Sequence, residues 1–314
     1  MDMETKNYSS SSMQDFILLG ISSNPQLQKP LFAVFLIMYL VTLVGNVLII
    51  LAIHSDTRLH TPMYFFLSNL SFMDIYFTTV IVPKMLVTLV SETKSIAYVG
   101  CLVQMYFFMA FANTDSYLLA SMAIDRLVAI CNPLHYDMAM SPRHCLLLLL
   151  GSCTISHLHS MLRVLLMSHL SFCPPHIIKH FFCNTQPVLK LSCSDTSSSQ
   201  MVVMTETLAV ITTPFLCTLF SYLRIIVMVL GVPSVAGKWM VFYTCDSHLT
   251  MVVLFYGSVI YVYFRPLSMY SMVKDRVATV MYTTVTPMLN PFIYSLRNKD
   301  MKRGFRKLRD RSHS

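Results

Sequence analysis

An acidic and a basic residue stand side by side where a long apolar stretch of the chain ends. The stretch starts near Cys101 and runs into MAIDRLVAICNPLHY (122–136), which contains Asp125 and Arg126. Opposite charges at such a boundary can form a static salt bridge at a helix end. They can also form an ion pair that is satisfied in one conformation and broken in another, which makes it a conformational switch. The pair by itself leaves both interpretations open.

A second set of polar residues lies inside apolar stretches, where an unpaired charge is costly. These residues are Asn46, Asp74, Asp115 and Asn290. Asp115 lies about 16 Å from Arg126 along a helix. Two carboxylates at mid-depth can share a proton or hold a cation such as sodium, because bare like charges repel strongly in a low dielectric. A hydrogen-bonded polar core that fixes the helix register is the alternative.

The composition places these residues in a membrane protein. Of the 314 residues, 55% are hydrophobic and 12% are charged, which is roughly half the charged share of a soluble domain. The apolar runs are continuous and long, as helices require, whereas barrel strands alternate over about 10 residues. We expect an all-α bundle of seven transmembrane helices, with spans at about 31–54, 64–90, 99–128, 145–167, 201–230, 239–263 and 273–297.

Charge predicts the topology of these spans. The last 18 residues hold eight Lys and Arg against two acids, whereas residues 1–30 hold two Lys against three acids. Basic flanks stay in the cytoplasm, so we expect residues 1–30 outside, a transmembrane domain over 31–297 and a cytoplasmic tail over 298–314. The basic tail is predicted to be an amphipathic helix on anionic lipid and not a nucleic-acid-binding segment. Asn7 heads a glycosylation sequon, NYS, on the expected outer side, and the first span is expected to act as the signal anchor.

Cysteines divide by their expected compartment. Four of them lie on the oxidising side, at Cys101, Cys173, Cys183 and Cys193, where disulfides persist. We predict two bridges there, although spacing does not select among the three possible pairings. A metal site at HIIKHFFC (176–183) is the less favoured alternative, and no metal is predicted.

Several motifs together resemble one family. They are GN at 45–46, LHTPMYFFLSNLSFMD at 59–74, MAIDRLVAICNPLHY at 122–136, SY at 221–222, TCDSHL at 244–249 and PMLNPFIYSLRN at 287–298. The set resembles the olfactory receptors, a branch of the rhodopsin-like, class A G-protein-coupled receptors. The resemblance implies a non-enzymatic plasma-membrane receptor without a cofactor. Such a receptor binds a small volatile odorant in the extracellular half of the bundle and activates a heterotrimeric, stimulatory olfactory-type G protein through cAMP.

The resemblance also implies roles for individual residues. It implies a G-protein switch made of Asp125, Arg126, Tyr222, His248, Asn290, Pro291 and Tyr294. It implies a sodium or proton site at Asp74, Asp115 and Asn46, and disulfides Cys101–Cys183 and Cys173–Cys193. Three positions depart from the family pattern and face the expected G-protein side, namely Leu127, Met240 and Tyr243.

A ligand site is expected between the extracellular halves of four spans. The third span offers a stripe at i, i+3, i+4 and i+7, which places its members on one helix face. Together with positions taken from the resemblance, the predicted lining is Met105, Phe108, Met109, Ala112, Asn113, Glu206, Thr207, Val210, Tyr256, Val259, Ile260, Tyr263, Val280 and Thr283. A lining of Met, aromatic and aliphatic side chains is typical of small-molecule sites, although the stripe could also be ordinary packing. Glu206 could anchor an amine, accept from a hydroxyl, or pair with Lys190 or Arg265.

Two other functions remain as alternatives. A transporter or channel could use Asp74, Asp115 and Arg126 as a charge pathway, but the chain has no internal repeat. A receptor of the same fold with weak G-protein coupling is the other alternative, because of Leu127, Met240 and Tyr243.

Overall fold

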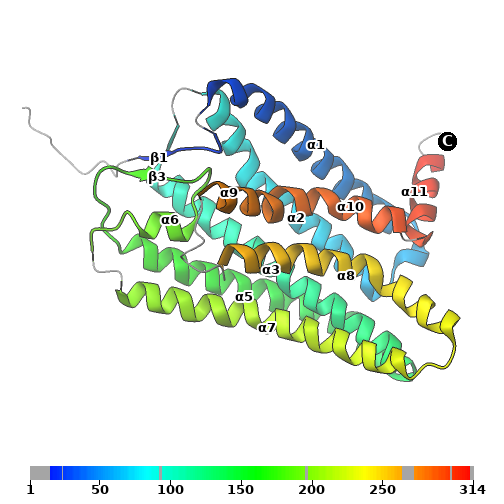
Figure 1. The fold of residues 1–314 in the computed structure, drawn as a ribbon. Helices are drawn as coiled ribbons and strands as arrows, with labels where there is room; N and C mark the ends of the chain where they lie inside the picture. The colour runs from blue at the N-terminus through cyan, green and yellow to red at the C-terminus, as the bar shows by residue number, and fades with distance from the viewer. Residues whose placement is uncertain are drawn as a thin grey trace, which may run out of the picture.

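A bundle of long helices makes up nearly the whole of the computed structural model, which describes residues 15–22, 24–91, 94–194, 197–263, 272–297 and 299–311. The long helices are α1 (Pro25–Ser55), α2 (Pro62–Val90), α3 (Tyr98–Cys131), α5 (Pro142–Ser168), α7 (Ser197–Leu230) and α8 (Val235–Tyr263). A last one consists of α9 (Met272–Val280), a π-helical turn (Met281–Val285) and α10 (Thr286–Arg297). The described part of the chain therefore contains seven long helical segments running roughly alongside one another (Figure 1).

Proline sets the start of three of these helices. Pro25, Pro62 and Pro142 occupy the first turn of α1, α2 and α5, where the missing N–H would have no intrahelical partner and the fixed φ suits a helix. Asn24 caps α1, and its side chain accepts a hydrogen bond of 3.0 Å from the backbone N–H of Gln26. The loops between spans therefore end where the sequence supplies a proline.

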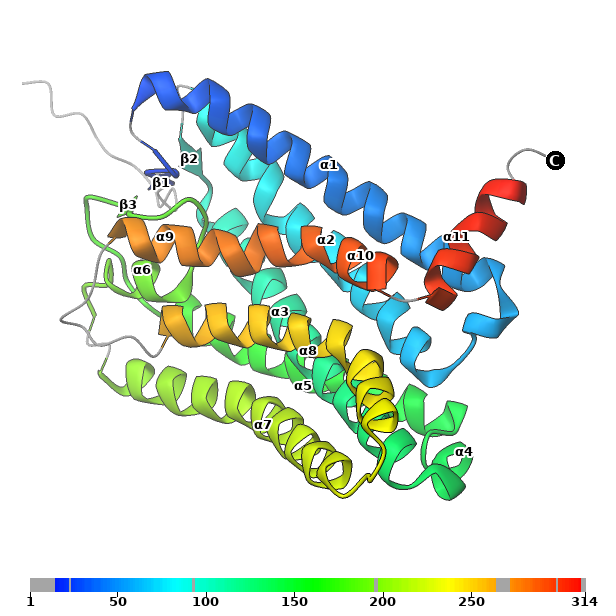
Figure 2. The same ribbon diagram turned by 45° about the vertical axis from the view of Figure 1, so that its right-hand side comes forward.

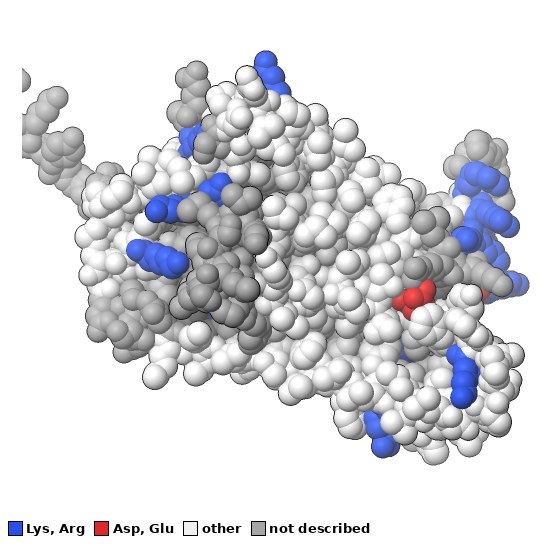
Figure 3. All heavy atoms as spheres, viewed as in Figure 1, with Lys and Arg blue, Asp and Glu red and all other residues white. Residues whose placement is uncertain are grey.

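Large apolar side chains cover the outside of the bundle. Ile37 on α1 is 61% exposed and Val227 on α7 is 68% exposed, and aliphatic side chains over so much surface indicate a lipid-facing belt. On the face shown in Figure 3, Lys and Arg gather at the two ends and the middle is free of charge. In the described residues, α1, α2, α5 and residues 207–230 of α7 are each long and apolar enough to cross a membrane. Helix α3 joins them as a bent pair with Pro133–Ala139.

One end of the bundle, here named the cap end, carries a small sheet and two disulfides. Strand β1 (Phe16–Leu18) lies between β2 (Ser95–Ile96), its antiparallel partner, and β3 (Ile177–Ile178), its parallel partner. The structure joins Cys101 to Cys183 and Cys173 to Cys193, which is the pairing that the resemblance implies. The first bridge ties the loop after α5 to the start of α3, and the second closes a ring within that loop.

The same loop carries a run of buried rings over the bundle. Phe182 packs on Phe108 of α3 with ring centroids 4.7 Å apart, and His180 stacks on Phe181 at 4.5 Å. Burial, and to a smaller extent the positive charge of Arg276, lowers the pKa of His180 to about 3. Its imidazole is therefore neutral at physiological pH. Because Cys183 is in a disulfide, it cannot serve as a thiolate ligand, and no three metal-ligating side chains come together in the described residues.

The opposite end, here named the tail end, carries the short amphipathic helix α11 (Lys299–Arg311), which turns away from the bundle axis (Figures 1 and 2). Arg303 and Lys307 of α11 lie 3.6 and 3.3 Å from the carboxylate of Asp56, which follows α1. Hydrogen bonding from Arg58 and Lys307 lowers the pKa of Asp56 despite the opposing effect of desolvation. Gly304 allows this close approach, because a Cβ there would lie 2.8 Å from Leu59.

Helices α1 and α10 also meet at a glycine, which gives a testable prediction. A Cβ on Gly45 would lie 2.8 Å from the ring of Pro291, so Gly45→Ala is expected to destabilise the receptor by about 1–3 kcal/mol through overpacking. The measurement is thermal unfolding of the purified receptor. Gly151→Ala is the matched control, because nothing lies within 4 Å of its Cβ position and helix propensity favours alanine. Equal unfolding temperatures for the two variants would contradict the packing argument.

Candidate functional site

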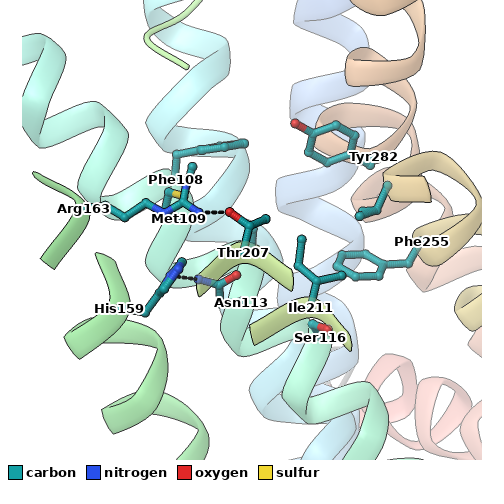
Figure 4. Close-up of a pocket in the computed structure, with 12 residues that line it drawn as sticks. Phe108, Met109, Asn113, Ser116, His159, Arg163, Thr207, Ile211, Phe255 and Tyr282 are labelled. Atoms are coloured by element: carbon teal, nitrogen blue, oxygen red, sulfur yellow. Dashed lines mark hydrogen bonds between the residues drawn. The ribbon is translucent and has the colours of Figure 1, made fainter. Parts of the chain in front are cut away.

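A partly enclosed cavity lies between helices in the half of the bundle nearer the cap end. Its volume is about 50 Å³. The lining comes from α3, α5, α7, α8 and the last helix, and consists of Phe108, Met109, Ala112, Asn113, Ser116, His159, Arg163, Thr207, Ile211, Phe255, Val259 and Tyr282 (Figure 4). Because ligand pockets usually measure about 300–1,000 Å³, a ligand here must be small or must move these side chains apart.

The cavity has a polar wall, defined here as Asn113, His159, Arg163 and Thr207. Asn113 Nδ2 donates to His159 Nδ1 at 2.9 Å, and Arg163 Nη2 donates to Thr207 Oγ1. Both bonds join different helices, α3 to α5 in the first case and α5 to α7 in the second. His159 and Arg163 are buried, and they lie on one face of α5 because they are four residues apart.

Apart from Ser116, the remaining lining consists of aliphatic, Met and aromatic side chains. Phe108 and Met109 come from α3, Phe255 from α8 and Tyr282 from the π-helical turn of the last helix. Figure 4 shows Phe255 and Tyr282 across the cavity from the polar wall. The arrangement can hold a small molecule with one polar group and an apolar body, which is the general make-up of such sites.

Six predicted ligand-site residues line this cavity, namely Phe108, Met109, Ala112, Asn113, Thr207 and Val259. The stripe on α3 therefore faces the cavity along most of its length. Met105, the first residue of the stripe, packs instead in the cluster around Cys101 and Cys183. Met105 lies nearer the cap end than the cavity does, beside the Cys101–Cys183 disulfide.

The other predicted ligand-site residues lie elsewhere or outside the described side chains. Tyr256 is buried below the cavity, where its hydroxyl lies 2.8 Å from Ser116 Oγ. Thr283 bonds to the carbonyl of Thr279, and Ile260 is on the outside of α8. Val210 and Val280 are half-buried and do not line the cavity. Glu206, whose role was left open, and Tyr263 have side chains outside the described set, as does the sequon at Asn7.

Sequence reasoning missed half of the lining, including Ser116, Ile211, Phe255 and Tyr282. Its most important omissions are His159 and Arg163. A signal for them was present, because SHLHSMLR (156–163) places ionisable side chains in a segment that should be dry, and such residues are functional candidates by default.

Polar residues at mid-depth form a tight cluster between α2, α3 and the last helix. Asn290 Nδ2 donates to Asp74 Oδ2, and both residues line a small cavity with Asp115. Its volume is about 10 Å³, which holds at most about one water molecule. Asn46 is hydrogen-bonded apart from it, to the carbonyls of Thr42 and Pro287. The structure thus brings Asp74, Asp115 and Asn290 together. Asn46 lies outside this cluster and instead connects α1 to α10.

At the tail end, the charge pair belongs to a three-residue group. Arg126 Nε lies 3.6 Å from Asp125 Oδ2, and the hydroxyl of Tyr136 donates to Asp125 Oδ1 at 2.7 Å. Tyr136 begins the short helix α4 (Tyr136–Ala139), so the loop after α3 contributes to holding the acid. The side chain of Asp125 is 1% exposed and that of Arg126 is 17% exposed. Arg126 therefore has access to the tail-end surface while its partner does not.

A second contact at this level links α7 to α8. The hydroxyl of Tyr222 lies 2.6 Å from His248 Nδ1, and both side chains are buried. Tyr294 of α10 is also buried, and Pro291 packs against Gly45. Between the cavity and the tail end, these contacts therefore join α7 to α8 and α10 to α1.

Comparisons with known proteins agree with this architecture. Residues 35–309 match the family model described as "Olfactory receptor". The human olfactory receptors 1L4 and 1L6 are each 83% identical to the chain over 99% of its length, covering 100% and 89% of their own lengths. The crystal structure of squid rhodopsin superposes with a TM-score of 0.73 at 18% identity, covering 90% of this chain and 85% of its own.

A full-length match to curated olfactory receptors and the fold of rhodopsin together describe a multi-pass plasma-membrane receptor that is not an enzyme. The chain belongs to the olfactory receptor family.

Proposed function

We propose that this odorant receptor binds a small volatile molecule in the cavity between α3, α5, α7 and α8 and activates a stimulatory, olfactory-type G protein that raises cAMP. The proposal places the cap end on the extracellular side and α11 on the cytoplasmic surface of the membrane. The observation that carries the proposal is the continuity of α8. Phe255 lines the cavity, and His248, seven residues earlier on the same helix, holds Tyr222.

The distance between these two points on α8 is short, about 10 Å along the helix. A ligand that pushes Phe255 outward would therefore tilt the segment that carries His248 and loosen its bond to Tyr222. Arg126 would then leave Asp125 for Tyr222 and Tyr294, which completes an opening of the tail end. Such a ligand biases a two-state equilibrium in proportion to its preference for the open state.

The mid-depth cluster fits the same two-state scheme. Asp74 and Asn290 connect α2 to the last helix directly beside Pro291. We propose that Asp74 and Asp115 share a proton in the compact state, because the 10 Å³ cavity is too small for a hydrated cation. A sodium ion would need the cluster to expand.

The test is a cAMP assay in cells that express the receptor and an olfactory stimulatory G protein, across a panel of odorants. Surface staining measures how much receptor reaches the plasma membrane. We expect at least one odorant to raise cAMP in a concentration-dependent way. No response to any odorant, despite normal surface staining, would contradict the proposed coupling.

A weakly coupled receptor is a second candidate, which one observation favours. Tyr243 on α8 is 73% exposed near the tail end, with its ring 6.1 Å from that of Trp239. Two bulky rings on the face expected to meet the G protein would obstruct it.

The prediction is that Tyr243→Ser increases the maximal cAMP response without a change in the odorant concentration for half-maximal response, because the substitution removes bulk from the tail-end surface alone. Tyr261→Ser, an exposed tyrosine at the other end of α8, is the control. If both variants changed the maximal cAMP response equally, Tyr243 would not be the residue that limits coupling.

A further inference from the structure

The polar wall of the cavity offers hydrogen-bond donors to a ligand. Because an amide nitrogen can only donate, the bond from Asn113 Nδ2 makes His159 Nδ1 the acceptor. The proton of the neutral imidazole is then on Nε2, which is a donor. Within the described residues, Nε2 of His159 is buried and has no hydrogen-bond partner, and His159 itself is only 8% exposed. A buried donor without a partner is costly, so a group supplied by the ligand would stabilise it.

Arg163 lies one turn further along α5 on the same face and also lines the cavity. A guanidinium presents five N–H donors in a fixed plane, so it can hold Thr207 and a ligand oxygen together. Within the described lining, Arg163 is the residue that carries a permanent charge, and that charge is positive. Two neighbouring side chains that carry donors therefore line the same side of the cavity.

We infer that the ligand of this cavity carries an oxygen acceptor, a carbonyl or a carboxylate, that accepts hydrogen bonds from His159 and Arg163 while its hydrocarbon part lies against Phe255 and Tyr282. The inference rests on the proposed function of the cavity as the odorant site. It assigns ligand recognition to α5, in the segment that sequence reasoning left without a role.

The inference excludes a primary amine as the preferred polar group. A protonated amine is a donor, so it would face the donors of His159 and the positive charge of Arg163 without an acceptor from either. The opposite expectation, an amine anchored by Glu206, is therefore a competing outcome. The two can be separated by ligands of one carbon skeleton that differ only in their polar group.

The experiment measures binding directly, on the purified full-length receptor in lipid nanodiscs, as a shift of the thermal unfolding temperature. Two matched series are used: hexane, hexanal, hexanoate and hexylamine, and cyclohexane, cyclohexanone, cyclohexanecarboxylate and cyclohexylamine. We expect the carbonyl or the carboxylate of at least one series to raise the unfolding temperature in a saturable way. The hydrocarbon and the amine of that series should have no effect at the same concentration.

Variants distinguish the two acceptor classes and test the residues. Arg163→Gln keeps hydrogen-bond donors and removes the charge, so it should weaken a carboxylate about ten- to hundredfold and a neutral carbonyl only about threefold. His159→Phe should weaken either about three- to tenfold. His157→Phe is the control on the same helix. His157 bonds to Tyr106 and does not line the cavity, so ligand affinity should not change.

Several results would overturn the inference. These are amines or hydrocarbons that stabilise the receptor as well as the oxygen compounds do, no stabilisation by any member of either series, and affinities that Arg163→Gln and His159→Phe leave unchanged. An amine response that Glu206→Gln abolishes would assign recognition to Glu206 instead. Because binding is measured without a G protein, a receptor that binds carbonyls but raises no cAMP would contradict the proposed coupling and leave this inference standing.

Discussion

The Arg126→Ala receptor is expected to lose its odorant-stimulated cAMP response down to the level of cells without receptor. Arg126 is the one partner of the Asp125–Arg126 pair that reaches the tail-end surface, and its guanidinium is the group that moves between Asp125 and the tyrosines in the proposed switch. Removing it also leaves the buried carboxylate of Asp125 without its cation. Breaking a buried ion pair costs about 3–5 kcal/mol, so the unfolding temperature should fall as well.

Two further variants separate signalling from stability. Arg126→Lys keeps the charge beside Asp125 and should restore most of the stability but only part of the response, because an ammonium lacks the planar donors of a guanidinium. Arg143→Ala removes an exposed arginine at the start of α5 and should change neither property. A full cAMP response from Arg126→Ala at normal surface expression would exclude the charge pair from the switch.

Cys101→Ser is expected to abolish surface expression or to lower the unfolding temperature more than substitution of any cysteine outside the Cys101–Cys183 bridge. The bridge from Cys101 to Cys183 closes a loop with a sequence separation of 82, compared with 20 for Cys173–Cys193. In the chain-entropy model this difference makes the longer bridge more stabilising by about 1 kcal/mol, within a usual total of about 2–5 kcal/mol. The longer bridge also holds Phe182 on Phe108, over the cavity.

The measurements are surface staining in cells and thermal unfolding of the purified receptor. Cys173→Ser should show a smaller loss. Cys153→Ser, a free thiol on α5, should show none. If Cys153→Ser were as damaging as Cys101→Ser, cysteine replacement itself and not the bridge would be the cause.

The size of the cavity has a consequence for ligand selection. At about 50 Å³ it is smaller than a typical ligand site, so any ligand larger than this volume must move lining side chains outward. Phe255 and Tyr282 lie on the two helices that also carry His248 and Asn290. Ligands that fit without moving these rings would bind without stimulating, because they would not distinguish the two conformations.

Helix positions and the membrane class followed from the sequence because they depend on local properties. Long apolar runs need only enough length to cross a bilayer, and Pro25, Pro62 and Pro142 start helices through their own geometry. The face of α3 that lines the cavity was also predictable, since helical periodicity places Phe108, Met109 and Ala112 together. The motifs shared with olfactory receptors suggested the disulfide pairing that the structure contains. They also suggested the switch residues, whose role stays a prediction.

Only the tertiary structure decided that α5 also lines the site. His159 and Arg163 were visible as ionisable residues in an apolar span, but whether they face lipid, another helix or a cavity depends on the rotation of α5 about its axis. That rotation is set by packing against α3 and by the bonds to Asn113 and Thr207, which connect residues 44 or more apart in the chain. Likewise, the π-helical turn that contains Tyr282 has no local sequence rule of its own. Local sequence leaves several rotations of a helix about its axis nearly equal in energy, and contacts with distant segments decide which one is adopted. For that reason the polar wall as a whole could be found only in the folded bundle.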